Sequence, residues 1–496
     1  MTRSRSSTWP RVAVSVSLLL AAACADPTRP SDLHPASPDA VRATVAAASV
    51  IAPLYVADFI STAATGASMN DNGDIIGTSY TDPGCGPFCL PPQETVVWRN
   101  GTRTVLPPLA TGTPFYVRMI NNSAWIVGLS GTPGTATKAV LWRPSGTGFA
   151  ATDLGALSKR AVSEATGIDQ TGRVVGFSRT LYFPPTGSPF VWSASTGLTD
   201  LAPLGFPSED PLAISPNGRV ATASYTYQLG NVASVTRQPA PPSGYYAGNW
   251  PVVINDNGDL ARFLITVSSQ NLAYPFRLPA GGTWQQISTT YSGSRTPFGF
   301  GTINNAQDVT LTILGGGAVA VGPTGTAQSL TSRVATSYQG ASVSRAGTLN
   351  ARGQILANLF IGRSARLVRL TPATPCTTNC ARSATVALTG TFVQDRRYPG
   401  SCFQGGTMYN AITARVTARS EAGAVLSGAT VAVRILDDYW TNRLLTATTN
   451  ASGVATFSTR TPCGVGTVAL LVDRITAGTR TFDRTAGVMT ASVIPQ

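Results

Sequence analysis

Histidine is almost absent from this sequence. Its one histidine, His34, stands near the N-terminus among Pro, Ser and Asp residues. A Ser-His-Asp triad, a Cys-His dyad and a zinc site ligated by histidine all need this side chain in the folded body. We therefore expect no catalytic residue of these kinds, no metal and no cofactor.

Charge is also sparse. Only 12% of residues are charged, and 36 basic residues against 23 acidic ones give a formal net charge of +13. The arginines are scattered, and just two residues are lysine, Lys138 and Lys159. This pattern lacks the basic stripe of a nucleic-acid-binding surface, so we expect no nucleic-acid partner.

A long apolar run occurs only in the leader. Residues 1–23 combine an arginine-containing start, an apolar stretch at 12–20 and three alanines directly before Cys24. This resembles a lipoprotein signal peptide, although Ala21 stands where leucine is usual, and it implies lipidation of Cys24. The alternative is an ordinary secretory signal that leaves this cysteine free. We expect an exported, lipid-anchored protein of the cell envelope or cell surface, followed by a disordered tether at 24–49.

The other cysteines agree with export. Six of them fall into three local pairs, and an even number in an exported chain indicates disulfides rather than the less favoured thiolate metal site. The pairs are Cys85 with Cys89, Cys376 with Cys380, and Cys402 with Cys463.

One short phrase recurs along residues 50–371. The phrase consists of an aliphatic residue, Asn or Asp, two polar residues, Gly, one variable residue and two aliphatics. It appears as Met69–Gly77 and returns, with looser copies, at intervals of 40 to 51 residues. Asn, Asp and Gly tolerate left-handed backbone angles, so each copy predicts strand, tight turn, strand. The repeat turns begin at positions 70, 121, 169, 215, 255, 304 and 350.

A second hairpin follows the phrase in the clearer copies, as in 95–106 and 139–155. Two hairpins in about 45 residues make four antiparallel strands, the size of a propeller blade. We predict a seven-bladed β-propeller over 50–371. The segment 54–59 resembles the strand before later copies and is expected to pair with 367–370 and close the ring. An open stack of repeats is the alternative.

The alternation of Ile-Asn-x-x-Gly-x-Val-Val-Gly, Phe-Val-Trp and Asp-Leu-Gly resembles the HAF repeats of bacterial extracellular proteins. The resemblance covers about 50–371. The His-Ala-Phe motif itself is replaced, for example by Lys138-Ala139-Val140. It implies an extracellular propeller and names no ligand.

The pattern changes after a linker at 372–384. Six or seven short alternating strands in 385–496 predict a β-sandwich. The phrases at 426–431 and 449–457 resemble bacterial Ig-like domains of the invasin type, which implies a surface spacer or adhesion module. The fold class is therefore all-β: a seven-bladed β-propeller followed by an Ig-like β-sandwich.

Candidate site residues are few. The acidic residues of the repeats stand at turns, which favours hairpin chemistry over paired catalytic carboxylates. The turns at 70–74 and 255–259 are similar to calcium loops but lack their alternate carboxylates and distal Glu. The aromatics Tyr245, Tyr246 and Trp250 are the one candidate patch for stacking on a sugar.

We therefore expect a monomeric, non-catalytic lipoprotein. It would contact the membrane through its N-terminal lipid and bind a glycan or a surface protein. The alternative is a propeller-type carbohydrate-active enzyme, a lyase or hydrolase, that uses carboxylates or Tyr in the central channel.

Overall fold

The computed structural model describes most of the chain after residue 50. The described residues are 51–62, 64–80, 93–132, 136–181, 187–247, 252–268, 272–287, 299–313, 317–323, 327–393, 409–438, 442–463 and 465–496. Ala46–Gln496 forms one compact unit. Its regular structure in the described ranges is strand, apart from short 3-10 helices at Ala202–Leu204 and Thr331–Arg333. Within those ranges, no helix has the length and apolarity that a membrane crossing requires.

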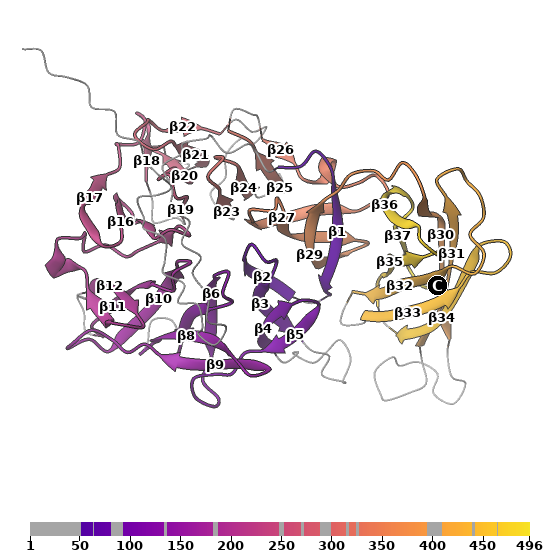
Figure 1. Cartoon of the computed structure of the whole chain (residues 1–496), viewed down its shortest axis with the longest axis horizontal. Coiled ribbons are helices and arrows are strands. Elements are labelled where there is room, and N and C mark those ends of the chain that lie inside the picture. Colours follow the sequence, from indigo (N-terminus) through magenta and orange to yellow (C-terminus); the bar gives the residue numbers. More distant parts are fainter. Residues whose placement is uncertain are drawn as a thin grey trace, which may run out of the picture. The chain divides into compact units, whose positions relative to one another are not determined.

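The first three repeats each fold into one antiparallel sheet whose strands follow chain order (Figure 1). The first sheet contains β2 (Ala64–Met69), β3 (Ile75–Tyr80), β4 (Gln93–Arg99) and β5 (Thr102–Val105). The second contains β6 (Phe115–Ile120), β7 (Ile126–Ser130), β8 (Lys138–Ser145) and β9 (Gly148–Asp153). The third contains β10 (Val162–Ile168), β11 (Val174–Arg179), β12 (Gly187–Ser193) and β13 (Gly197–Asp200).

The next three repeats follow the same plan with shorter strands. The fourth sheet contains β14 (Ala213–Ile214), β15 (Arg219–Ala221), β16 (Tyr225–Gln228) and β17 (Asn231–Arg237). The fifth contains β18 (Tyr245–Tyr246), β19 (Val252–Ile254), β20 (Leu260–Thr266), β21 (Ala273–Leu278) and β22 (Gln285–Gln286). The sixth contains β23 (Gly299–Ile303), β24 (Val309–Ile313), β25 (Gly317–Val321) and β26 (Gln328–Ser329).

The last repeat is completed by the start of the folded chain. It supplies β27 (Ser342–Leu349), β28 (Ile355–Ile361) and β29 (Ser364–Pro372), and the outer place is taken by β1 (Tyr55–Ser61). β1 runs antiparallel to β29, with Asp58 opposite Arg369. The N-terminal strand therefore pairs where the sequence predicted.

The inner strands form a closed circuit. β2 contacts β6, β6 contacts β10, and the contacts continue through β14, β19, β23 and β27 back to β2. Figure 1 shows these sheets placed around a common centre. A circuit of antiparallel sheets with one edge of each sheet at the centre is a β-propeller.

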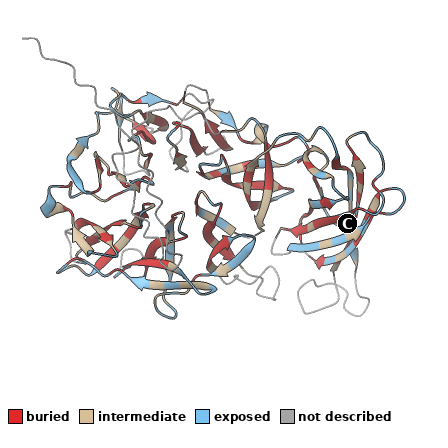
Figure 2. Ribbon diagram, in the orientation of Figure 1, coloured by how far each residue is buried: buried red, intermediate tan, exposed pale blue. Residues whose placement is uncertain are grey.

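The sheets are held together by apolar side chains between them. The middle strands of the sheets are the most buried (Figure 2). In the second sheet, every residue of β7 is buried. Trp142 is fully buried, and its indole Nε1 donates to the carbonyl of Pro107 at 2.8 Å. Trp98 and Trp192, at the same place in their repeats, are also buried. The recurring tryptophans are therefore core residues.

The remaining strands form two more sheets, in which all but one of the strand pairs are antiparallel. One contains β34 (Val454–Pro462), β31 (Tyr409–Ser420), β30 (Cys380–Val393) and β36 (Thr481–Gly487). The other contains β33 (Asn442–Thr448), β32 (Thr430–Asp437), β35 (Val468–Thr476) and β37 (Thr490–Val493). Buried apolar residues of these two sheets share one cluster with buried residues of β1 and of β27 to β29.

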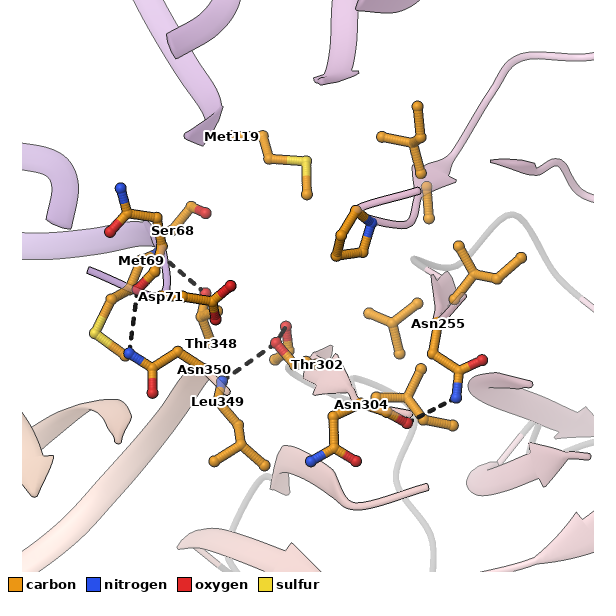
Figure 3. A pocket seen from close by; sticks show the side chains of 18 of the residues that line it. Ser68, Met69, Asp71, Met119, Asn255, Thr302, Asn304, Thr348, Leu349 and Asn350 are labelled. Carbon is orange, nitrogen blue, oxygen red and sulfur yellow. Dashed lines mark hydrogen bonds between the residues drawn. The ribbon is translucent and has the colours of Figure 1, made fainter. Parts of the chain in front are cut away.

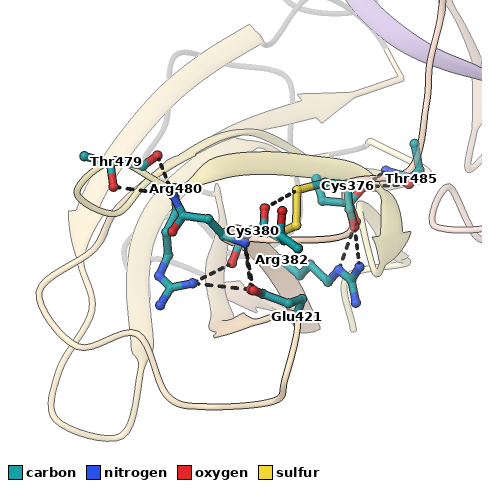
Figure 4. Close-up of a disulfide and its surroundings, with 10 residues drawn as sticks. Cys376, Cys380, Arg382, Glu421, Thr479, Arg480 and Thr485 are labelled. Atoms are coloured by element: carbon teal, nitrogen blue, oxygen red, sulfur yellow. Dashed lines mark hydrogen bonds and ion pairs between the residues drawn. A yellow bond between two sulfur atoms is a disulfide. The ribbon is translucent and has the colours of Figure 1, made fainter.

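A disulfide joins Cys376 to Cys380 at the start of β30, which confirms that predicted pair (Figure 4). Beside it, Glu421 accepts hydrogen bonds from the backbone N–H groups of Asn379 and Cys380 and pairs with Arg480 at 3.3 Å. β30 thus begins within the segment expected to be a linker. Of the other predicted pairs, Cys85, Cys89 and Cys402 lie outside the described residues, and so does Cys24.

Candidate functional site

The repeat phrase folds into the same turn each time. In the second repeat, Ala124 N–H donates to the carbonyl of Asn121, and the side-chain Oδ1 of Asn121 accepts from the N–H groups of Ser123 and Trp125. The fourth residue of every repeat turn has a positive φ. It is glycine in five copies, as at Gly73 with φ 85°, because a left-handed backbone costs glycine little.

The same Asn also links neighbouring sheets, which the sequence pattern did not predict. Asn350 Nδ2 donates to the carbonyl of Asn70, Asn70 to that of Asn121, and Asn121 to that of Asp169, at 2.9 to 3.1 Å. Asn255 donates to Asn304 in the same way at 2.7 Å. The bond from Asn350 to Asn70 joins the last repeat to the first, so the turns are tied around the ring as well as within each sheet.

The acidic residues of the turns complete this network. Asp71 accepts from Asn122 Nδ2 at 2.9 Å with one oxygen and from the N–H of Ala351 at 2.8 Å with the other. Asp256 accepts from Asn305 Nδ2 and from the N–H of Asn217. These carboxylates therefore point to neighbouring sheets rather than to a common point. Nowhere in the described ranges do three or more His, Cys, Asp or Glu residues gather as metal ligands.

A cavity of about 570 Å³ lies inside the ring of repeat turns, and we call it the central cavity (Figure 3). All the inner strands contribute to it. Figure 3 shows Met69 beside Thr348 and Asn350 of another sheet, so apolar and polar side chains meet at its wall. Its polar side chains are Ser68, Asn70, Asp71, Arg118, Asn122, Thr166, Gln170, Asn255, Asp256, Thr302, Asn304, Asn305, Thr348 and Asn350.

Some of these groups keep hydrogen-bonding capacity. Thr348 Oγ1 accepts from the N–H of Met69 at 3.3 Å, which leaves its own hydroxyl hydrogen free to donate. Gln170 Oε1 accepts from the N–H of Asn122 at 2.8 Å, which leaves the two hydrogens of its Nε2. The cavity thus offers neutral donors held in place by a fixed framework.

The ends of the inner strands that lie away from the repeat turns carry charged side chains of both signs. Glu164 and Asp210 each stand five residues before their repeat turn, as do Tyr116 and Arg345 in other repeats. An oxygen of Glu164 and one of Asp210 each lie 3.9 Å from the same Nη2 of Arg179. The two carboxylates therefore approach the same guanidinium.

The surroundings of Asp210 favour its protonated form. Burial raises the pKa of this carboxyl, Arg179 opposes the rise, and the charge of Glu164 adds to it. Sequence reasoning missed this pair because it considered only the acids within the turns. The shared spacing of five residues ahead of the turn is the signal that identifies it.

The predicted aromatic patch is divided. Tyr245 packs edge-on against Phe276, with ring centroids 5.0 Å apart, and belongs to the apolar core of its sheet. Tyr246 is exposed, with 42% of its surface accessible. Trp250 lies outside the described residues. Neither tyrosine lines the central cavity.

The sequence matches no known protein family, and no curated protein is significantly similar to it. Similar solved structures include a puromycin hydrolase, with 10% identity, 73% of this chain and 61% of that chain covered, and a TM-score of 0.37. The β-propeller domain of the Trilobed protease from Pyrococcus furiosus shares 8% identity, covers 80% of this chain and 94% of that chain, and has a TM-score of 0.27.

An exo-beta-1,3-galactanase from Phanerochaete chrysosporium, solved with beta-1,3-galactotriose, is also similar. It has 10% identity, covers 76% of this chain and 93% of that chain, and gives a TM-score of 0.25. At such identities the likeness concerns the fold alone. This chain spans about three fifths of the puromycin hydrolase.

These structures correct the expectation that the chain is not an enzyme. One similar structure is named a puromycin hydrolase and another an exo-beta-1,3-galactanase, so the comparisons give no ground for excluding an enzyme. The physical reason is that the scarcity of histidine removes only histidine-dependent chemistry, whereas carboxyl pairs catalyse glycoside hydrolysis without it. Glu164 and Asp210 are two carboxylates that both approach Arg179, so acidic side chains do come near each other in this chain.

Proposed function

We propose that the protein binds a saccharide in the central cavity. The observation that carries this proposal is the convergence of fixed amide and hydroxyl groups with apolar side chains in one space of about 570 Å³. Small-molecule sites are commonly of this size and combine apolar walls with a few placed polar groups. Carboxamides both donate and accept hydrogen bonds, so they match sugar hydroxyls, and the apolar residues match the C–H faces of the ring.

The test uses the full mature chain and a variant that fills the cavity. Leu212 lines the cavity, and 36% of its surface is exposed. Leu212→Trp should abolish binding of oligosaccharides selected on a glycan array, measured by titration calorimetry. Val232→Trp, at an outer strand position that is 48% exposed, should leave binding unchanged. Equal affinity of both variants and the parent would overturn the proposal, provided that their unfolding midpoints agree.

A second candidate function is hydrolysis or elimination of a glycan at the ends of the inner strands that lie away from the repeat turns. It is favoured by the Glu164–Asp210 pair beside Arg179. A protonated Asp210 would act as the general acid and Glu164 as the base or nucleophile. Glu164→Gln and Asp210→Asn should each lower glycan cleavage by a factor of about 100 or more.

The matched control for this candidate is Glu94→Gln, because Glu94 pairs with Arg103 on the outer strands. Its cleavage rate should equal that of the parent. The raised pKa of Asp210 adds a second readout, because activity should fall as pH rises through that pKa. Reducing-end release that is unaffected by both site variants would rule this candidate out.

We also propose the finer architecture that the repeats suggest: seven blades of the HAF-like type, followed by an Ig-like module that acts as a spacer. The seven repeat turns and the closed circuit of inner strands support the first part. The two sheets of the C-terminal region support the second. Lipidation at Cys24 would hold the protein at a membrane, and Cys24→Ala should release it into the soluble fraction of the cell envelope.

A further inference from the structure

A second cavity, of about 240 Å³, lies beside the central one, and we call it the side cavity. It is formed by the first, second and last repeats, and Ala67 lines both cavities. The residues that line it are Thr65, Gly66, Ala67, Thr78, Thr95, Phe115, Tyr116, Val117 and Arg345.

Three hydroxyls form one row along the side cavity. Thr65 lies opposite Thr78 in the pairing of β2 with β3, and Thr78 lies opposite Thr95 in the pairing of β3 with β4. Their side chains therefore stand on one face of this sheet. Within the described ranges, none of the three hydroxyls donates or accepts a hydrogen bond, although only 9% of Thr95 is exposed. Thr95 is buried, Thr78 is half-buried and Thr65 is exposed, so the row leads from the surface into the side cavity. Each of these hydroxyls can donate a hydrogen bond to a polar ligand there.

The charge in the side cavity is positive. Arg345 is the one charged residue among those that line it. It is exposed, and it forms no ion pair or hydrogen bond through its side chain in the part of the chain that the structure describes. The nearby acid Glu94, next to Thr95, is engaged with Arg103. The guanidinium of Arg345 thus keeps its planar set of donors for a ligand.

We propose that the side cavity binds an oxyanion, with Arg345 and the threonine row as its donors. A carboxylate, sulfate or phosphate group accepts hydrogen bonds from a guanidinium and from hydroxyls at once. Since Ala67 separates the two cavities, an acidic saccharide would place its anionic group at Arg345 and its neutral ring in the central cavity. The saccharide part of this inference rests on the proposed function, whereas the anion site itself does not.

The experiment titrates the full mature chain with three compounds: a neutral galactose trisaccharide, a galacturonate trisaccharide and inorganic sulfate. The galacturonate compound should bind at least about tenfold more tightly than the neutral one, as expected for hydrogen bonds to a charged group. Arg345→Gln should remove that difference and leave the affinity for the neutral compound unchanged. Thr78→Val, which deletes one hydroxyl at nearly constant volume, should lower galacturonate affinity by a factor of about three to ten.

The matched control is Arg237→Gln, because Arg237 is an exposed arginine on the outer strand β17. It makes the same change of charge and should leave every affinity unchanged. An equal loss in Arg237→Gln and Arg345→Gln would overturn the anion site. Equal binding of the two trisaccharides would overturn it as well, while the proposed function would stand.

Two further outcomes separate the anion site from the proposed function. Sulfate binding that depends on Arg345, without binding of either trisaccharide, would overturn the saccharide function and support a site for a free inorganic anion. Binding of none of the three compounds would overturn both proposals.

Discussion

The same turn occurs in two regions of the molecule with different partners. In the C-terminal region, Asn450 accepts hydrogen bonds from the N–H groups of Ser452 and Val454, as Asn121 does from Ser123 and Trp125 in the ring. Asn450 is exposed, whereas Asn121 is buried and also donates to the next sheet. Identical local chemistry thus closes a hairpin in one region and joins sheets in the other.

This difference explains how a turn motif that accepts several residue types can also form the wall of a ligand site. The turn itself needs only a side-chain oxygen at its first position, from Asn, Asp169 or Ser215, and a fourth residue that accepts a positive φ. The ring adds a requirement for the side-chain amide, which must reach a carbonyl of the neighbouring repeat. That carbonyl is 48 to 51 positions away, or 280 positions away where the last repeat meets the first. The central cavity therefore has walls fixed by both kinds of bond, which is the condition for a preorganised site.

The largest expected effect is at Asn121. Asn121→Ala removes two hydrogen bonds within the turn and one to Asp169 in a buried setting. At about 1 kcal/mol each, the free energy of unfolding should fall by about 3 kcal/mol, measured by urea denaturation. A loss no larger than that of Asn450→Ala would contradict the difference between the two regions.

A glycine substitution tests the same difference between the turns of the ring and those of the C-terminal region. Gly172 in the ring and Gly423 in the C-terminal region have φ of 85° and 84°. A Cβ on Gly172 would lie 2.7 Å from the ring of Trp125, whereas one on Gly423 meets nothing within 4 Å. Gly423→Ala should cost about 1 kcal/mol for the backbone alone, and Gly172→Ala about 2 kcal/mol or more. Equal shifts in denaturation midpoint would show that the ring turns are not packed against each other.

Asp58 connects the two regions. It accepts from Arg484 of β36 at 2.7 Å and from Thr371 of β29 at 2.6 Å, and it pairs with Arg369. Burial alone would raise the pKa of Asp58, but Arg484 and the hydrogen bonds lower it below its ordinary value. Its contribution to stability is therefore complete above the unfolded-state pKa of about 3.9 and is lost as pH falls through the lower, folded value.

Asp58→Asn should therefore cost about 2 kcal/mol at pH 7, and it should flatten the dependence of stability on pH below about 4. Thermal unfolding of the parent and variant between pH 2 and 7 measures both. Parallel pH curves for the two proteins would contradict the role of this carboxylate.

The smallest expected effect is at Asn450. Its turn is exposed, so water replaces the lost hydrogen bonds in Asn450→Ala, and the cost should be about 1 kcal/mol or less. This variant should also bind oligosaccharides as the parent does. A loss of affinity in titration would place the ligand in the C-terminal region instead of the ring.

Much of the fold could be predicted from the sequence. The phrase around Asn70 determines a local hairpin, and its recurrence predicts repeated sheets, because turn chemistry depends on adjacent residues. The pairing of β1 with β29 followed from the similarity of the first strand to later ones, whereas the register that places Asp58 opposite Arg369 did not. The pair Cys376 and Cys380 followed from short spacing and export.

The site was less predictable because its contacts cross repeats. Neither the bond from Asn121 to Asp169 nor the approach of Glu164 and Asp210 to Arg179 is visible within one copy. The side cavity depends on Arg345 meeting the first repeat after the ring closes. Aligning the copies by their turns reveals candidate positions, but only the closed ring determines which side chains meet.

Hydrogen–deuterium exchange of the full mature chain, with and without the trisaccharide that binds more tightly, would locate the ligand. A ligand in the central cavity should slow the exchange of backbone amides in the inner strands and repeat turns around the ring, and it should leave the turn of Asn450 unchanged. Protection confined to outer strands or to the C-terminal sheets would contradict a ligand site at the centre of the propeller.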